Sequence, residues 1–354
     1  MRGASIVFVV AVGFGGIAAC VGNDPNLDSD GKPDDAGRGS DSDQSTKNDD
    51  DASPDGPDGG PSPDPDSGSD SDADGGGKGG PGFAVVSPNI ELEAGQQIST
   101  CYYFHTTNAT PLAIKSWSSK LGQGVDHMAL VFTDTDKAAP GTLSTADCEI
   151  FGTGGSWVYS AWTPTAGWSF PADDGSGKPL GKPVKANQSA YLVIQMTNGT
   201  SAKLTSKVEL DAVAYDPGTT VTAAEPYVAQ NADINVAANT NNVVVSRTCS
   251  VPAGAKLTWM TMFAHRRASQ LTIKGGGTTV FDTSNFANPG SKAFSAPFYA
   301  FPNDKAEYSC TYNNPTTQPF SAGPSPKSDE ACAMLGYHFP ASKPRLCVTS
   351  TLLP

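Results

Sequence analysis

Residues 191–196 read YLVIQM and are followed by Thr197-Asn198-Gly199, so a short apolar and aromatic run ends in turn-forming residues. Valine, isoleucine and aromatic residues are enriched in strands, whereas asparagine and glycine favour the turns between strands. The run has the length of an ordinary strand and is shorter than most helices. We therefore predict a β-strand at this position.

The same kind of run recurs along the chain, at residues 84–86, 129–132, 208–215, 242–246, 257–262 and 270–273. Gly, Pro, Asn and Asp separate these runs, and no long stretch has the apolar spacing of an amphipathic helix. The sequence therefore predicts an all-β protein with two consecutive antiparallel β-sandwiches of jelly-roll-like type. A composition break at Asp216-Pro217-Gly218 predicts one domain over residues 83–217 and a second over 218–354. No close internal repeat is visible in the residues themselves.

The first twenty residues have the pattern of a bacterial export signal. Arg2 is followed by an apolar stretch over residues 6–17, which is shorter than a comfortable membrane span. It ends in Ile17-Ala18-Ala19-Cys20, which resembles the lipobox in which the cysteine receives diacylglycerol. An ordinary secretory signal and an uncleaved N-terminal helix are the alternatives. We expect lipidation of Cys20 and anchoring to the outer membrane, with the protein exposed to the periplasm or at the cell surface.

Residues 21–82 consist mainly of Asp, Ser, Gly and Pro. They hold 17 Asp and 4 Lys or Arg, a net charge of −13 that equals the formal charge of the whole chain. Such a segment cannot bury enough apolar surface to offset its ordering entropy, so we predict a disordered tether. The folded part is then near neutral, and a basic nucleic-acid-binding face is not expected.

Seven cysteines are present, and six remain if Cys20 is lipidated. An even number of cysteines in an exported chain predicts disulfides. The spacing contains no CxxC pair, which argues against a zinc site.

Several segments of the first half resemble the copper type II, ascorbate-dependent monooxygenases, the family of the peptidylglycine α-hydroxylating and dopamine β-monooxygenases. Cys101-Tyr102-Tyr103-Phe104 resembles the opening cysteine strand of that family. Residues 125–130 (VDHMAL) resemble its His-His-Met motif, and Cys148 follows at a fitting distance. Residues 159–162 and Phe170-Pro171 resemble the Tyr-x-x-Trp and proline segment. Residues 192–198 (LVIQMTN) resemble the Leu-x-Leu-Gln-x-His-Tyr strand.

The second half continues the resemblance in the same order, which extends over about residues 90–340. Residues 262–267 (MFAHRR) resemble the His-x-His-x-x-Gly motif, and residues 294–304 resemble the segment before the Gly-Asp turn. Residues 308–314 (YSCTYNN) resemble a cysteine strand, and residues 329–332 (DEAC) resemble Asp-Glu-Met-Cys. Residues 336–340 resemble the aromatic strand that follows.

The resemblance implies two β-sandwiches, each with one copper, facing each other across a solvent cleft. It also implies the disulfide pairs Cys101–Cys148, Cys249–Cys347 and Cys310–Cys332. One copper of the family is held by three histidines, and the other by two histidines and a methionine, a donor set that suits both redox states of copper.

Most of these copper ligands are replaced in this chain. At the first site His127 remains, Asp126 stands in place of its histidine neighbour, and Thr197 lies near the third position. At the second site His265 remains, while the other two positions hold Phe263 and Ala331. His127, Asp126 and His265 are therefore the candidate metal positions, and one imidazole per site cannot hold copper tightly. We expect no resident cofactor, and copper is the metal to test.

Other side chains support no catalytic site of a known kind. There is no Gly-x-Ser-x-Gly motif, and the adjacent Asp173-Asp174 sits among turn-forming residues. His105 and His338 are expected on strand surfaces. Trp157 and Trp168 are candidate ligand-binding aromatics, since aromatic clusters can stack on sugars, whereas Trp162 fits a core position.

The leading hypothesis is a lipid-anchored cell-envelope protein with a monooxygenase-like fold that acts as a binding or surface module without redox catalysis. Its ligand would be a protein, a peptide or a glycan that the sequence does not identify. One alternative is an active copper- and ascorbate-dependent monooxygenase with rearranged ligands. A second is a carbohydrate- or peptide-binding β-sandwich without any link to that chemistry.

Overall fold

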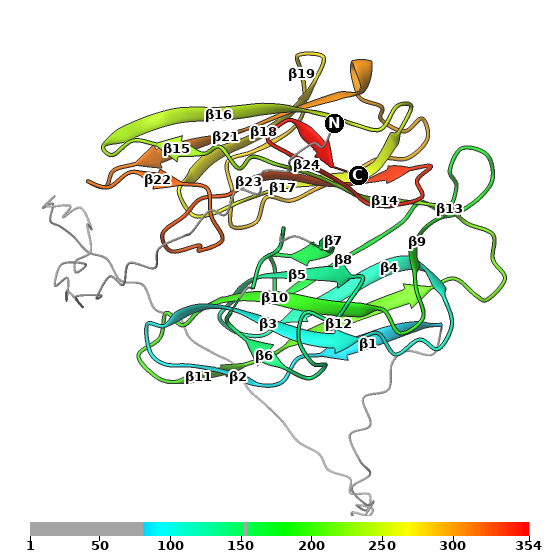
Figure 1. The fold of residues 1–354 in the computed structure, drawn as a ribbon, viewed down its shortest axis with the longest axis horizontal. Coiled ribbons are helices and arrows are strands. Elements are labelled where there is room, and N and C mark those ends of the chain that lie inside the picture. The colour runs from blue at the N-terminus through cyan, green and yellow to red at the C-terminus, as the bar shows by residue number, and fades with distance from the viewer. Residues whose placement is uncertain (1–80, 147, 152–153, 354) are drawn as a thin grey trace, which may run out of the picture. The chain divides into compact units, whose positions relative to one another are not determined.

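The computed structural model describes residues 81–353 apart from 147 and 152–153, and Figure 1 shows them as two sets of β-strands. The described chain consists of strands, loops and one short 3₁₀ turn, η1 (Pro302–Asp304). The prediction of an all-β protein built from antiparallel sandwiches is therefore confirmed. Cys20, the signal peptide and nearly all of the predicted tether lie outside the described residues. Within residues 81–353 as described, no helix is long and apolar enough to cross a membrane.

The first half of the described chain contains two main sheets and one short strand pair. One sheet has the order β1-β12-β4-β9-β13 with β8 beside β4: β1 (Gly82–Val86), β12 (Val208–Ala214), β4 (Leu112–Leu121), β9 (Leu180–Val184), β13 (Thr222–Ala223) and β8 (Thr165–Ser169). The other has the order β6-β3-β10-β5-β7: β6 (Leu143–Ser144), β3 (Gln97–His105), β10 (Ser189–Thr197), β5 (Val125–Thr133) and β7 (Gly155–Ala161). The short pair is β2 (Ile90–Leu92) with β11 (Leu204–Ser206).

The second half has the same three parts. One sheet has the order β20-β17-β23-β14-β24-β25: β20 (Lys292–Ala293), β17 (Lys256–Ala264), β23 (Cys332–Phe339), β14 (Glu225–Gln230), β24 (Arg345–Val348) and β25 (Thr351–Leu353). The other has the order β16-β21-β18-β19: β16 (Thr240–Ser250), β21 (Lys305–Asn314), β18 (Ala268–Gly275) and β19 (Thr278–Thr283). The short pair is β15 (Asn235–Val236) with β22 (Phe320–Ser321).

The two halves repeat one topology, strand for strand. The order β1-β12-β4-β8 corresponds to β14-β23-β17-β20, and β3-β10-β5-β7 corresponds to β16-β21-β18-β19. Each half is thus an eight-stranded jelly roll of two four-stranded sheets, with additional strands at the edges. The repeat lies in the strand connections, because the residues alone show no close repeat. The domain boundary after residue 217 remains a prediction: β13 still pairs with β9, and β14 begins at Glu225.

A buried asparagine lies at the end of the equivalent strand of each half, Asn198 after β10 and Asn314 at the end of β21. The amide nitrogen of Asn198 lies 3.2, 3.0 and 2.8 Å from the carbonyl oxygens of Leu92, Glu93 and Ala202. Its Oδ1 accepts hydrogen bonds from the amide and hydroxyl of Thr200.

Asn314 repeats this network in the second half. Its amide nitrogen lies near the carbonyl oxygens of Val236, Ala237 and Gln318, and its Oδ1 accepts from Thr316. Both asparagines are fully buried. Because one side chain satisfies several main-chain groups that no strand partner reaches, it holds the short strand pair onto the main sheet.

One sheet of each half is buried on both faces. Every described position of β17 after Lys256 is buried, as are all residues of β23 and most of β5, β7 and β10. In β4, β12 and β21, by contrast, buried and more exposed positions alternate, as expected for a sheet with one solvated face. The continuously buried sheets are therefore the two that pack against each other. The core cluster of the first half accordingly includes Trp259, Leu335 and Tyr337.

Aromatic rings fill the contact between the two halves, and Trp168 of β8 joins it from the other sheet of the first half. The Trp157 ring stacks on Trp259 with centroids 6.1 Å apart and planes at 15°, and Trp168 stacks on the same ring at 5.2 Å and 9°. Tyr337 contacts both Trp157 and Trp168, and its hydroxyl donates a 2.7 Å hydrogen bond to the Val158 carbonyl. Stacked rings of this kind stabilise the contact beyond their buried area.

A buried ion pair also connects the halves. Lys182 of β9 and Glu225 of β14 approach to 2.9 Å, and both side chains are less than one-tenth exposed. The Lys182 ammonium also donates to the Pro183 carbonyl and lies over the Phe132 ring. Each charge depends on the other, because either one alone would be buried without a counter-ion.

Three disulfides crosslink the structure, which confirms the disulfide prediction. They are Cys101–Cys148, Cys249–Cys347 and Cys310–Cys332, the pairs that the resemblance implies. Cys249–Cys347 and Cys310–Cys332 each join the two sheets of the second half. Cys101–Cys148 ties β3 to the segment that leads into β7.

Replacement of Asn198 or Asn314 by Ala should destabilise the protein by on the order of 3 kcal/mol, because several buried carbonyl and amide groups lose their partner. Urea unfolding followed by circular dichroism measures the change. Asn288→Ala, at an exposed loop position, is the matched control and should change stability by less than about 0.5 kcal/mol. Equal midpoints for Asn198→Ala and the control would contradict the role assigned to this side chain.

Lys182→Met should lower the unfolding free energy by about 3–5 kcal/mol, since Glu225 is left as a buried, unpaired charge. The double variant Lys182→Met/Glu225→Gln removes both charges and should recover part of the loss. A double-mutant cycle from urea unfolding tests this, and additive losses in the double variant would argue against coupling of the two groups.

Candidate functional site

The two candidate metal histidines come close together around one phenylalanine. His127, on β5, has its ring centroid 5.1 Å from that of Phe263 and 5.0 Å from that of Trp162. His265 directly follows β17, and its ring lies 5.4 Å from Phe263. His127 is 3% exposed and His265 is 6% exposed, so aromatic side chains surround both imidazoles.

Burial makes both imidazoles neutral. Loss of hydration, together with the nearby His265, lowers the pKa of His127 to about 3. Burial also lowers the pKa of His265. Both ring nitrogens of His127 lack a hydrogen-bond partner, whereas Nδ1 of His265 lies 3.0 Å from the Asp329 carbonyl oxygen. That bond assigns the proton of neutral His265 to Nδ1 and leaves Nε2 as an acceptor.

The donor set does not fit a copper ion. Asp126 is exposed while His127 is buried, because neighbouring residues of a strand point to opposite faces. The Asp126 carboxylate accepts a 2.5 Å hydrogen bond from the Thr197 hydroxyl. Within the described part of the chain, no three His, Cys, Asp or Glu side chains are grouped so that they could hold a metal. The candidate positions Asp126, His127 and His265 are therefore not brought together as ligands of one ion.

Two expectations about other side chains are corrected. Trp157 is only 2% exposed and Trp168 is half-buried against Trp259, so these residues form no open platform for a ligand. The sequence suggested ligand-binding positions for Trp157 and Trp168 because it does not show that the second half covers them. His338 is 2% exposed rather than on a strand surface, and burial lowers its pKa to about 4. His105 is half-exposed and bonds Asp136 at 2.7 Å.

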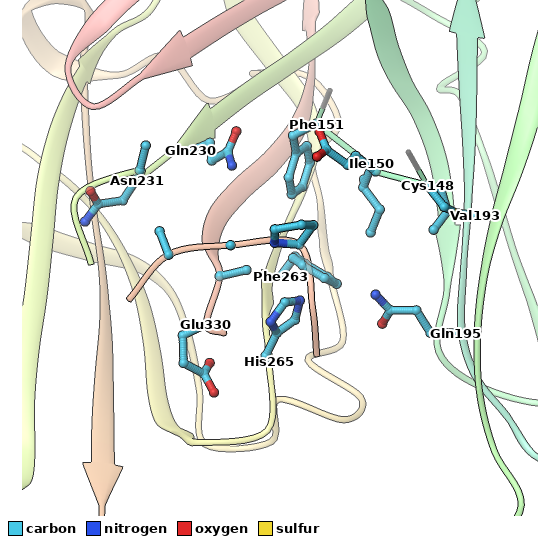
Figure 2. Close-up of a pocket in the computed structure, with 16 residues that line it drawn as sticks. Cys148, Ile150, Phe151, Val193, Gln195, Gln230, Asn231, Phe263, His265 and Glu330 are labelled. Atoms are coloured by element: carbon cyan, nitrogen blue, oxygen red, sulfur yellow. The ribbon is translucent and has the colours of Figure 1, made fainter. Parts of the chain in front are cut away.

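A pocket of about 260 Å³ opens beside His265. Residues of both halves line it, and Figure 2 shows the Gln195 carboxamide of β10 pointing toward the His265 ring. Phe263, Phe151 and Ile150 provide an apolar wall, and Gln230, Asn231 and Glu330 line the pocket from the second half.

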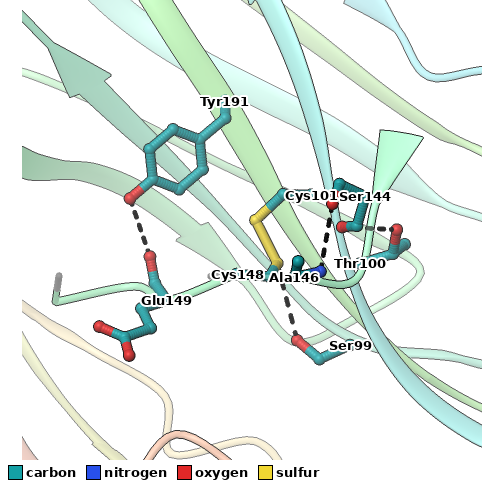
Figure 3. Close-up of a disulfide and its surroundings, with 8 residues drawn as sticks. All are labelled: Ser99, Thr100, Cys101, Ser144, Ala146, Cys148, Glu149 and Tyr191. Atoms are coloured by element: carbon teal, nitrogen blue, oxygen red, sulfur yellow. Dashed lines mark hydrogen bonds between the residues drawn. A yellow bond between two sulfur atoms is a disulfide. The ribbon is translucent and has the colours of Figure 1, made fainter. Parts of the chain in front are cut away.

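The apolar wall depends on the Cys101–Cys148 crosslink. Figure 3 shows this disulfide and, next to it, the Tyr191 hydroxyl donating a 2.9 Å hydrogen bond to the Glu149 carbonyl. These two attachments hold the segment that carries Ile150 and Phe151 against the sheet. A second groove of about 420 Å³ shares Cys148, Glu149 and Pro324 with the pocket, so the two spaces are neighbours.

Glu330 is the charged group of the pocket. It is fully buried, and its Oε1 accepts hydrogen bonds from the Arg267 main-chain amide at 3.1 Å and guanidinium at 3.2 Å. Its Oε2 is buried without a partner. Burial raises the pKa of Glu330 to about 7, against the stabilising effect of Arg267 on the charged form. Glu330 thus lines the pocket as a buried carboxyl group that is paired with Arg267.

Sequence reasoning missed Gln195, Gln230 and Asn231 as site residues and treated Glu330 only as part of a motif. A signal existed for Gln195, since it is the single polar residue within YLVIQM. Nothing in the sequence shows that Gln230 and Asn231, at the end of β14, line the same pocket as Gln195.

No family model and no curated protein matches this chain. Among solved structures, the chain is similar to empty particles of cowpea mosaic virus, with 8% identity, a TM-score of 0.26, and coverage of 69% of this chain and 88% of that one. It is also similar to the Sulfolobus turreted icosahedral virus, with 10% identity, a TM-score of 0.20, and coverage of 72% and 59%. At these scores neither likeness carries an argument about function.

His127 should make the protein sensitive to acid. Its folded-state pKa of about 3 lies below its ordinary value, so its contribution to stability is complete above about pH 6.5 and is lost as pH falls toward 3. The loss approaches about 1.4 kcal/mol per pH unit. His127→Phe should show a shallower fall in unfolding free energy between pH 6.5 and 4 than the parent, as measured by urea unfolding. Parallel curves would contradict the buried neutral imidazole.

Proposed function

We propose that this protein is a lipid-anchored cell-envelope protein whose folded part binds a ligand in the pocket beside His265. In this proposal its fold is related to the copper type II ascorbate-dependent monooxygenases, but it acts as a binding module without redox chemistry. The lipid anchor at Cys20 and the outer-membrane location are part of the proposal and rest on the lipobox-like sequence. Disulfides agree with an oxidising compartment.

One observation supports ligand binding above the others: several polar groups around one pocket have no partner. The side chains of Gln195 and Gln230 form no hydrogen bond within the described part of the chain. Asn231 Nδ2 and Glu330 Oε2 are buried and unpaired. Buried polar groups are nearly always hydrogen-bonded, so the two buried, unpaired atoms of Asn231 and Glu330 support completion by a ligand or ordered water. Gln195 and Gln230 are half-buried and add free amide groups at the same pocket.

The donor set supports a role without redox chemistry. Copper sites of the related kind need imidazole and thioether donors that converge on one ion. Here Phe263 contacts both candidate histidines, and Ala331, which lines the pocket, has no donor atom. An active monooxygenase with rearranged ligands is the alternative. It would require Phe263 to move so that ligand atoms could converge on one ion beside His127 or His265.

Two measurements on the full-length, disulfide-bonded chain test the proposal. Ligand-observed NMR with a mixed library of neutral, cationic and anionic small molecules and short peptides should detect binding. Ala331→Leu, which adds bulk to the pocket wall, should weaken that binding by about tenfold or more, whereas the matched Ala331→Ser should not. Binding of equal strength in the Leu and Ser variants would place the ligand elsewhere.

Copper titration is the second measurement. We expect no stoichiometric copper in the parent protein. Copper bound at one or two ions per chain, and lost in both His127→Ala and His265→Ala, would overturn the non-redox proposal and favour the monooxygenase alternative.

A further inference from the structure

The kind of hydrogen-bonding group in the pocket restricts the chemistry of its ligand. Gln195 and Gln230 each present a donor and an acceptor, and Asn231 presents a donor. His265 presents Nε2 as an acceptor, because its Nδ1 is engaged with the Asp329 carbonyl oxygen. Glu330 adds a second acceptor through Oε2. A ligand that fits these groups must donate and accept at several neighbouring positions, as hydroxyl groups do.

The charges around the pocket favour an uncharged ligand. Among the described residues that line it, none is Lys or Arg, so no cation is available for a carboxylate or phosphate. Glu330 is already paired with Arg267 at 3.2 Å, so it does not require a cationic partner. The remaining carboxylate, Glu149, is exposed and stays hydrated at the rim.

The pocket also offers apolar groups beside its polar ones. Phe151 and Phe263 contact each other edge to face at 5.7 Å, and Figure 2 shows Phe151 and Ile150 on the same side of the space. A ring with hydroxyl groups at its edge and C–H groups on its face matches this division, because aromatic side chains pack on such C–H faces.

The adjoining groove extends the same chemistry. It is lined by amide and hydroxyl side chains from β3 and from two loops, with one lysine at its side: Gln97, Ser99, Thr145, Ser325 and Lys327. It shares Cys148 and Pro324 with the pocket, so the groove lies directly beside the pocket.

We propose that the pocket binds the terminal residue of a neutral oligosaccharide, with Gln195, Gln230, Asn231 and Glu330 as its hydrogen-bonding groups and the next sugar units in the adjoining groove. This inference rests on the proposed binding function and names its ligand class. Gln195 comes from the first half and the other three from the second, so the halves must pack together for the site to exist.

A glycan array probed with the full-length chain tests the ligand class. The array carries neutral oligosaccharides together with glycans that end in uronic acids or amino sugars. We expect binding to a subset of the neutral glycans and at least about tenfold weaker binding to the charged ones. The free monosaccharide that corresponds to the bound terminus should compete, but more weakly than the trisaccharide, if the groove contributes. Equal competition would confine the ligand to the pocket and overturn the role of the groove.

Variants locate the binding. Gln195→Ala and Gln230→Ala should each weaken binding of the selected trisaccharide by about five- to tenfold, the loss expected for one neutral hydrogen bond. Gln123→Ala, at an exposed loop position, is the matched control and should bind like the parent. Thermal unfolding confirms that each variant is folded. Sugar binding that neither pocket variant weakens would overturn the assignment.

The outcomes separate this inference from the proposed function. If peptides or amines bind in a manner that Ala331→Leu blocks while no glycan binds, the carbohydrate inference fails and the pocket remains a binding site. If no compound of any class binds, both fail.

Discussion

The structure depends on the packing of one sheet of each half against the other. That contact buries β5, β7 and β10 against β14, β17 and β23, so these strands have no solvated face. The stacked rings of Trp157, Trp168 and Trp259 lie in the contact between the halves. Because apolar burial is the main favourable contribution to folding, the halves are stabilised by this contact as well as by their own cores.

The same contact determines what the candidate metal histidines can do. His127 and His265 belong to different halves, and packing brings both onto the Phe263 ring. The imidazoles therefore pack against an aromatic ring and are neutral, and within the described residues no group of three His, Cys, Asp or Glu side chains forms a metal site with them. Where the packing stops, beside His265, the pocket begins. Its polar groups come from strand ends and loops that neither half could bring together alone.

The two halves repeat one topology although their sequences differ. Each half has the same strand order and the same buried asparagine, Asn198 or Asn314, at the same corner. The sequences of the halves show no repeat because many different side chains are compatible with one strand position. The position of Asn198 and Asn314 is more restricted, because its side chain must be a short amide that reaches several carbonyl oxygens. The halves differ at their sheet edges. In the second half β24 and β25 extend one sheet, and in the first half β6 pairs with the edge strand β3.

The sequence by itself determined the fold class. Short runs such as YLVIQM, bounded by Asn and Gly, specify strands through local preference, and the six cysteines besides Cys20 predicted disulfides, whose pairing the resemblance implied. The family-like motifs pointed to His127 and His265, and to the residues missing beside them. Only the tertiary structure decided that Trp157 and Trp168 are interior, that His338 is buried, and that Gln195 faces Glu330 and Asn231 across one pocket. The physical reason is that strand formation depends on neighbouring residues, whereas burial of a side chain depends on which sheet packs over it. Contacts between residues far apart in the chain determine that packing, and with it which side chains line one pocket.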